Sequence, residues 1–182
     1  LYNMNGTQLR HVGGQFDITD IYGYDEKTGD IYYQAAAINP HDRQIYVAHK
    51  NGKIERLSDK EGCNYAIFSG DYRYFINTWS DYNTPYVYTT RDNQGRVLST
   101  NLDNKELKAK IAKYGWTQKE AFSFTTSEGV KLDGWMVKPA NFDSSRKYPV
   151  IMFQYSGPGN QQVMNSWNAG SIGQGGAYDM YL

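Results

Sequence analysis

A four-strand pattern occurs twice between residues 16 and 102, and this repeat constrains the fold more than any other feature of the chain. Ile45-Tyr46-Val47 returns 41 positions later as Tyr86-Val87-Tyr88, and Gly52-Lys53-Ile54 returns 43 positions later as Gly95-Arg96-Val97. A period of ~40–45 residues with four strands is typical of a β-propeller blade. Two blades cannot close a ring, so we expect further blades upstream. A stand-alone β-sandwich is the alternative that the same strands allow.

Turn residues divide each copy of the repeat into four short strands. The turns are Lys27-Thr28-Gly29-Asp30, Asn51-Gly52, Ser69-Gly70-Asp71 and Asn93-Gln94-Gly95. The predicted strands are 16–24, 30–38, 44–49 and 53–57 in the first copy, and 65–69, 72–80, 85–91 and 96–100 in the second. The 17 tyrosines of the chain favour strands over helices in this part.

Charge and composition argue against several classes of function. The 19 basic and 19 acidic side chains balance, which favours neither nucleic acid nor an anionic membrane as a partner. No apolar run approaches the ~20 residues that span a bilayer. Cys63 is the only cysteine, so we expect a small buried residue in a strand and no internal disulfide. Because the sequence starts at Leu1 without Met or a signal peptide, we interpret it as a piece of a longer protein.

A short helix is predicted after the repeats. Asp103 is a suitable N-cap, and Glu106 three residues later completes a capping box. Leu107 begins an apolar stripe that ends at Tyr114, and Gly115 follows where a left-handed residue ends a helix. We interpret residues 103–118 as a linker between two domains.

The pattern after the helix changes to that of a mixed sheet. Phe122 and Phe124 alternate with polar neighbours, Ser127-Glu128-Gly129 turns the chain, and a second strand runs from Val130 toward Pro139. The continuous apolar run Val150–Phe153 predicts a strand that is covered on both faces. An antiparallel hairpin followed by a buried parallel strand suits an α/β-hydrolase sheet.

Tyr155 lies where this last strand should end. Gln154 and Tyr155 bring polar groups to its carboxyl end, and Gly157-Pro158-Gly159 stops it. Chemistry collects at the carboxyl ends of strands in open α/β sheets, and a phenol with a pKa of ~10 stays protonated there as a hydrogen-bond donor. The glycine-rich stretch 170–176 lacks the Lys-Ser/Thr ending of a phosphate loop, so we expect a mobile loop that enters a helix near Tyr178.

Lys147–Gln161, with its K-Y-P, apolar run and Y-S-G-P, resembles the dipeptidyl peptidase IV branch of the prolyl oligopeptidase family of serine peptidases. The resemblance runs from about Phe16 to the end. It implies the last two blades of a β-propeller (1–102), a linker helix (103–118) and the N-terminal part of an α/β-hydrolase catalytic domain (119–182), mostly β within this fragment. It also implies that the Tyr155 hydroxyl forms half of the oxyanion hole, the site that holds the negative charge of the reacting carbonyl oxygen.

The other catalytic groups of that family have no counterpart in this sequence. There is no G-x-S-x-G, and the order serine, acid, histidine places all three downstream of Leu182. His11, His41 and His49 fall in the repeats without metal-ligand spacing, so each is interpreted as a surface or edge residue. The paired glutamates that bind the substrate's amino terminus would come from earlier blades. We therefore expect the fragment itself to be inactive, with no cofactor and no metal.

The resemblance implies that the full-length protein is a serine exopeptidase that releases N-terminal dipeptides with Pro or Ala at the penultimate position, by acyl-enzyme chemistry. Two alternatives stay open: a non-catalytic binding protein of the same architecture, and another peptidase of the prolyl oligopeptidase family. The expected partners are peptide substrates and, in the full-length protein, a second copy in a homodimer. The expected location is the periplasm, the cell surface or the extracellular space.

Overall fold

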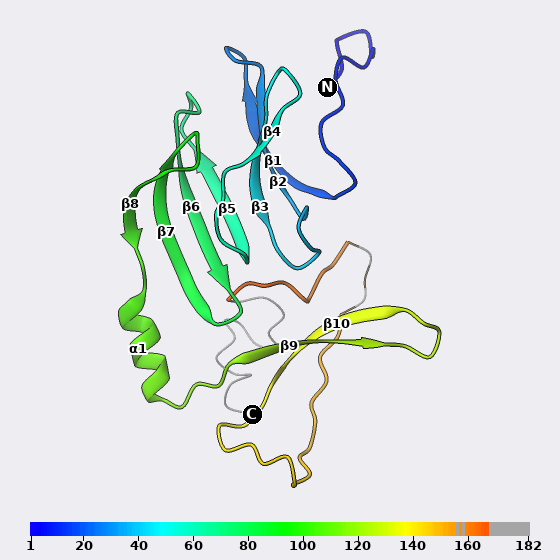
Figure 1. Ribbon diagram of the computed structural model, residues 1–182, viewed down its shortest axis with the longest axis vertical. Coiled ribbons are helices and arrows are strands. Elements are labelled where there is room, and N and C mark those ends of the chain that lie inside the picture. Colours follow the sequence, from blue (N-terminus) through cyan, green and yellow to red (C-terminus); the bar gives the residue numbers. More distant parts are fainter. Residues whose placement is uncertain (156, 158, 168–182) are drawn as a thin grey trace. The chain divides into compact units, whose positions relative to one another are not determined.

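The computed structural model describes residues 1–155, 157 and 159–167, and these residues are mostly in β-strands (Figure 1). The chain divides into two compact units. The first contains Leu1–Trp79 and Val87–Asp103, and the second contains Ser80–Tyr86 and the chain from Asn104 onward. The helix of the described part is too short and too polar to cross a membrane.

Two four-stranded sheets follow one another along the chain. The first contains β1 (Ile18–Asp25), β2 (Asp30–Ala35), β3 (Gln44–Ala48) and β4 (Ile54–Arg56), each antiparallel to the next. The second contains β5 (Cys63–Phe68), β6 (Tyr74–Asp81), β7 (Thr84–Asp92) and β8 (Val97–Leu102), also with sequential strands as neighbours. The eight strands confirm the predicted ones to within a few residues, and this order of strands is that of propeller blades.

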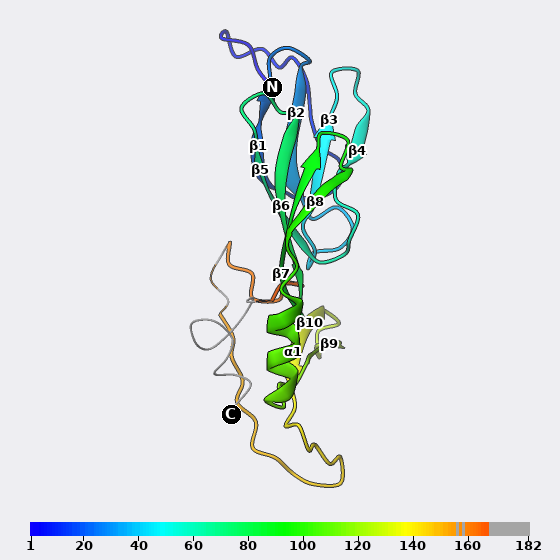
Figure 2. The ribbon, with the colours of Figure 1, turned by 90° about the vertical axis from the view of Figure 1, so that its left-hand side faces the viewer.

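An apolar core joins the two sheets. It is formed by the buried side chains of Tyr32, Ile45, Val47, Leu57, Ala66 and Phe75. The ring of Phe68 on β5 lies 4.7 Å from that of Tyr32 on β2, which is an aromatic contact between the sheets, and 4.8 Å from that of Phe75 in its own sheet. Figure 1 shows the sheets beside one another, and after a quarter turn in Figure 2 the second overlies the first. Full burial of such a side chain is worth ~1.5–3 kcal/mol, so this core stabilises the pairing of the two sheets.

Cys63 lies at the start of β5 and is fully buried, which confirms the expected small core residue in a strand. Its Sγ lies 3.6 Å from the carbonyl oxygen of His41. Burial raises the pKa of the Cys63 thiol to about 12. Because the unfolded chain releases this proton first, stability should fall as the pH rises above the ordinary thiol pKa of ~8.5.

We therefore expect iodoacetamide at pH 9 to leave Cys63 unmodified in the folded full-length protein and to modify it in denaturant. Peptide mapping by mass spectrometry measures both. A cysteine introduced by Ser99→Cys at an exposed position of β8 serves as the control and should react in both states. Labelling of folded Cys63 at the rate of that control would contradict the burial.

The predicted helix is present as α1 (Lys105–Lys113), but the predicted N-cap is wrong. The cap is Asn104, with a φ of 52° and no side-chain capping bond. Its Nδ2 instead donates to the carbonyl oxygen of Tyr86 at 2.6 Å, while its own carbonyl accepts from Lys108 N at 2.9 Å. The helix therefore starts one residue later, because a contact to β7 places Asn104. Gly115 has a φ of 68°, which confirms the left-handed stop.

The predicted hairpin after the helix is confirmed. It consists of β9 (Lys119–Thr125) and β10 (Lys131–Val137), which pair antiparallel from Lys131↔Thr125 to Val137↔Lys119 (yellow-green to yellow in Figures 1 and 2). The alternation of Phe122 and Phe124 with polar residues thus marked a real strand.

The predicted buried strand at Val150–Phe153 is wrong for the described structure. These residues are in no strand, and Val150 and Met152 are 87% and 81% exposed. A parallel strand needs neighbours for its backbone hydrogen bonds and cover on both faces. The residues that the structure describes supply neither at this position. The predicted loop at 170–176 and the helix near Tyr178 lie outside the described residues.

Candidate functional site

Tyr155, the sequence-predicted oxyanion donor, lies in an irregular segment of the second unit and is 58% exposed. The turn that follows it is partly described: Asn160 N donates to the carbonyl oxygen of Gly157 at 3.2 Å. A Cβ at position 157 would lie 3.0 Å from Cε1 of Tyr155, so glycine leaves room for the ring there. Ser156 and Pro158 of the motif lie outside the described residues. Tyr155 is thus largely exposed, as a side chain that donates to a ligand must be.

His49 is the histidine of the chain with the most catalytic-looking surroundings. Its Nδ1 lies 3.1 Å from Asp30 Oδ2, and its Nε2 lies 3.6 Å from Glu55 Oε2. A general base of acyl transfer needs one ring nitrogen directed at a hydroxyl nucleophile. Both nitrogens of His49 face carboxylates directly after β3, so neither is directed at a hydroxyl nucleophile. This agrees with the prediction of a surface or edge residue that is not a catalytic base.

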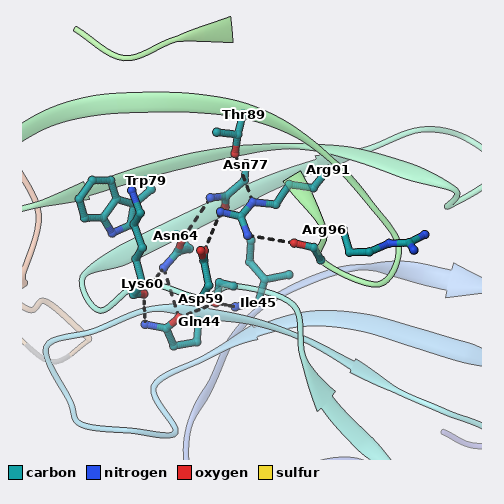
Figure 3. Close-up of polar contacts among 12 residues, drawn as sticks. Gln44, Ile45, Asp59, Lys60, Asn64, Asn77, Trp79, Thr89, Arg91 and Arg96 are labelled. Carbon is teal, nitrogen blue, oxygen red and sulfur yellow. Dashed lines mark hydrogen bonds and ion pairs between the residues drawn. The ribbon is translucent and has the colours of Figure 1, made fainter. Parts of the chain in front are cut away.

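The structure reveals a buried polar network between the two sheets that sequence reasoning missed (Figure 3). Gln44, Ser58, Asn64 and Asn77 are each at most 2% exposed. Ser58 donates to Gln44 Oε1 and accepts from Ile45 N at 3.1 Å. Asn77 Nδ2 donates to Asn64 Oδ1 at 3.2 Å, and Asn64 Nδ2 donates to the carbonyl oxygen of Lys60 at 3.2 Å.

A second part of this network centres on Arg91, whose side chain is 3% exposed. Its Nη2 lies 2.7 Å from Asp59 Oδ1, its Nη1 donates to the carbonyl of Gly95 at 3.1 Å, and its Nε donates to Thr89 at 3.2 Å. Burial would raise the pKa of Asp59, but the hydrogen bond and positive charge of Arg91 outweigh it and lower that pKa. The network contains amides, a guanidinium and hydroxyls that are hydrogen-bonded to one another or to the backbone. We interpret it as a structural network that fixes the two sheets against each other.

A pocket of about 370 Å³ lies on the first unit, and it is lined mostly by apolar and aromatic side chains, including Ile21, Tyr24, Ile31 and Tyr33. Arg10 also lines it and donates from Nη1 to the carbonyl oxygen of His49 at 3.1 Å. The described lining contains no serine, threonine or cysteine. It therefore does not provide a nucleophile for acyl transfer.

No group of three or more His, Cys, Asp or Glu side chains suited to a metal ion occurs among the residues that the structure describes. Tyr155 stays the predicted site residue of the chain, and its exposure allows contact with a ligand.

The comparisons with known proteins agree on one family. Residues 1–86 match the family model described as the dipeptidyl peptidase IV (DPP IV) N-terminal region. Dipeptidyl peptidase 4 of Trichophyton rubrum is 29% identical over 169 residues, which is 90% of this chain and 22% of the relative. Dipeptidyl peptidase 4 of Trichophyton equinum is 30% identical over the same shares of the two chains.

Two solved structures are similar to this chain in both fold and sequence. The crystal structure of Porphyromonas gingivalis dipeptidyl peptidase 4 matches with a TM-score of 0.86 and 39% identity, over 91% of this chain and 24% of that one. The crystal structure of a putative dipeptidyl aminopeptidase IV from Bacteroides ovatus matches with a TM-score of 0.77 and 25% identity, over 93% and 24% of the two chains. The chain thus spans about a quarter of the length of these proteins.

Proposed function

We propose, from the premise that this chain is homologous to the dipeptidyl peptidase 4 proteins over nine-tenths of its length, that it is part of a serine exopeptidase. The activity is the release of dipeptides from the free N-terminus of peptides, with Pro or Ala at the penultimate position. The observation that carries the proposal is the extent of the similarity. The family model of the N-terminal region ends at residue 86, whereas the similarity to whole proteins of this name covers 90% of the chain.

The span of the similarity includes the position of Tyr155. The unmatched tenth of the chain amounts to about 18 residues, whereas 27 residues follow Tyr155, so the matched span includes this tyrosine wherever it starts. The proposed domains are the C-terminal blades of a propeller (1–102), a linker helix (103–118) and the start of an α/β-hydrolase domain (119–182).

Exposed apolar faces support this division. On β5 and β6 the buried side chains alternate with Tyr65, Ile67, Tyr74 and Ile76, which are 40–73% exposed. On the β9–β10 hairpin, Phe124 and Leu132 are 48% and 43% exposed. Faces of this kind mark surfaces that another part of a protein covers. A further blade suits the first face, and the remaining layers of a hydrolase sheet suit the second.

The proposed role of Tyr155 follows from the chemistry of acyl transfer. When a serine attacks a peptide carbonyl, negative charge develops on the carbonyl oxygen, and a preorganised donor lowers the energy of that transition state. A neutral phenol is such a donor at pH 7. The serine, acid and base would come from outside residues 1–182, as would the glutamates that bind the substrate amino group. The proposed location outside the cytoplasm and the proposed homodimer belong to the full-length protein.

The reading frame past Leu182 separates the proposal from its main alternative. We expect G-x-S-x-G followed by an Asp and a His, in that order. An elbow with its serine replaced would instead make the protein a non-catalytic binding module, in which Tyr155 has no charge to stabilise. An intact triad with activity on internal bonds would favour another peptidase of the prolyl oligopeptidase family.

A further inference from the structure

The end of β6 and the turn that follows it contact the chain segment that lies downstream of Tyr155, and both belong to the second unit. Ser80, fully buried, has its Oγ 3.2 Å from the Oγ of Ser166, which is 5% exposed. The backbone N of Trp167 donates to the same Ser80 Oγ at 3.3 Å. Two positions further, in the turn itself, Tyr82 N donates to Asn165 Oδ1 at 3.0 Å. Three consecutive residues, 165–167, are therefore bonded to one turn.

The same turn also fixes the start of β9. Asn83 pairs in both directions with the backbone of Lys119, which donates from N to Asn83 Oδ1 at 2.9 Å and accepts at O from Asn83 Nδ2 at 3.1 Å. Lys119 is 3% exposed, and its Nζ lies 3.5 Å from the carbonyl oxygen of Trp167 and 4.6 Å from the ring centroid of Trp135. The ring of Trp167 stacks on that of Trp116 at 5.9 Å. We call Ser80, Asn83, Lys119, Ser166 and Trp167 the tip cluster.

The tip cluster contrasts with the segment that carries Tyr155. Between Lys119 and Ser166, no described residue is buried, and Tyr155 itself is 58% exposed. Ser166 is thus the described buried residue closest in sequence to Tyr155, 11 positions away. Local bonds tighten the part in between: Asn160 N donates to Gly157 O at 3.2 Å, and Gln161 Nε2 donates to Val163 O at 2.9 Å. Ser166 is therefore the nearest buried attachment point, among the described residues, for the segment that carries Tyr155.

We infer that Ser80 is a positioning residue for Tyr155: its hydroxyl anchors the downstream end of the loop whose phenol donates to the oxyanion. The inference rests on the proposed function. It gives the end of β6 a role in the placement of the Tyr155 hydroxyl. That placement matters because the donor must lie within hydrogen-bond distance of the charge that develops. A displacement of ~1 Å at a reacting group can cost ~10²-fold in rate.

The test is steady-state kinetics of the full-length protein on an Xaa-Pro chromogenic substrate. We expect Ser80→Ala to lower kcat about 10-fold and to change KM less than about 2-fold, because the lost interaction matters in the transition state. In a Tyr155→Phe background, Ser80→Ala should cause no further loss, since the two residues then act through one hydroxyl. If Ser80→Ala does not fold, Ser166→Ala replaces it in the test. This variant removes the other hydroxyl of the same contact and should lower kcat about 3-fold.

Ser58→Ala is the matched control. Ser58 is 2% exposed and accepts a backbone N–H from Ile45, as Ser80 does from Trp167, but it lies in the first unit. It should lower stability to a similar extent and leave kcat of the folded enzyme unchanged. The inference is overturned if Ser80→Ala has normal kcat, or if its loss multiplies with that of Tyr155→Phe. If Tyr155→Phe is itself fully active, the proposed role of Tyr155 is wrong, which is a separate outcome.

Discussion

Replacing Tyr155 with Phe in the full-length protein is expected to lower kcat by ~10²–10³-fold, the usual effect of removing one oxyanion-hole donor. The ring stays and the hydroxyl alone is removed, so binding of the substrate ground state should change little. Because Tyr155 is 58% exposed, the free energy of unfolding should also stay the same. Kinetics on an Xaa-Pro chromogenic substrate and a denaturant titration measure the two effects.

Tyr114→Phe provides the control for this substitution. Tyr114 is 73% exposed at the end of α1, and it has no proposed role in the reaction. It should retain full activity and stability. Near-normal turnover of Tyr155→Phe would remove this residue from the mechanism, whereas a parallel loss of stability would make its role structural.

Phe75→Ala is expected to give the largest loss of stability, ~3–5 kcal/mol. Phe75 is 2% exposed and packs between the two sheets, with its ring centroid 4.8 Å from that of Phe68. Truncation to Ala removes apolar contacts from both sheets at once and leaves a cavity that their hydrogen-bonded backbones cannot close. Guanidinium unfolding of the full-length protein, followed by fluorescence, should show a first transition at a much lower denaturant concentration.

Phe75→Leu is the matched control, because it keeps most of the volume and should cost less than ~1.5 kcal/mol. A clear order, with Ala far more destabilising than Leu, supports a shared core between the blades. Equal midpoints for the wild type and Phe75→Ala would show that the sheets do not depend on this core.

The eight strands of the first part could be predicted because local signals and long-range packing agree there. The turn at Asn51-Gly52 and the alternation around Ala66 and Phe75 describe the same faces that the sheets bury. The helix stop at Gly115 could be predicted for a simpler reason, since a left-handed stop depends on the conformation of one residue.

The polar network could not be predicted, because its partners are distant in sequence. Asn64 and Asn77 are polar residues on a buried face, and by pattern alone they belong on the solvent side. The carbonyl oxygen of Lys60 accepts from Asn64, and Asn64 Oδ1 accepts from Asn77; only the folded chain brings these groups together. The predicted N-cap at Asp103 was wrong for a similar reason, since a hydrogen bond to Tyr86 on β7 makes Asn104 the cap.

The run Val150–Phe153 shows the opposite case, in which a strong local signal has no partner within the described residues. A continuous apolar run specifies a strand only when neighbouring strands and covering layers are present. Tyr155 was predicted from its motif, and its exposure is consistent with a group that meets a ligand. Its proposed role depends on groups of the full-length protein.

The most direct test of the central claim is the product that the full-length protein releases from a synthetic peptide. The peptide has a free N-terminus and Pro at the second position, and mass spectrometry identifies the fragments. We predict that the N-terminal dipeptide is released, that acetylation of the N-terminus abolishes cleavage, and that a serine-directed phosphonate stops the reaction. Cleavage at internal bonds, or no cleavage by a protein with an intact triad, would contradict it.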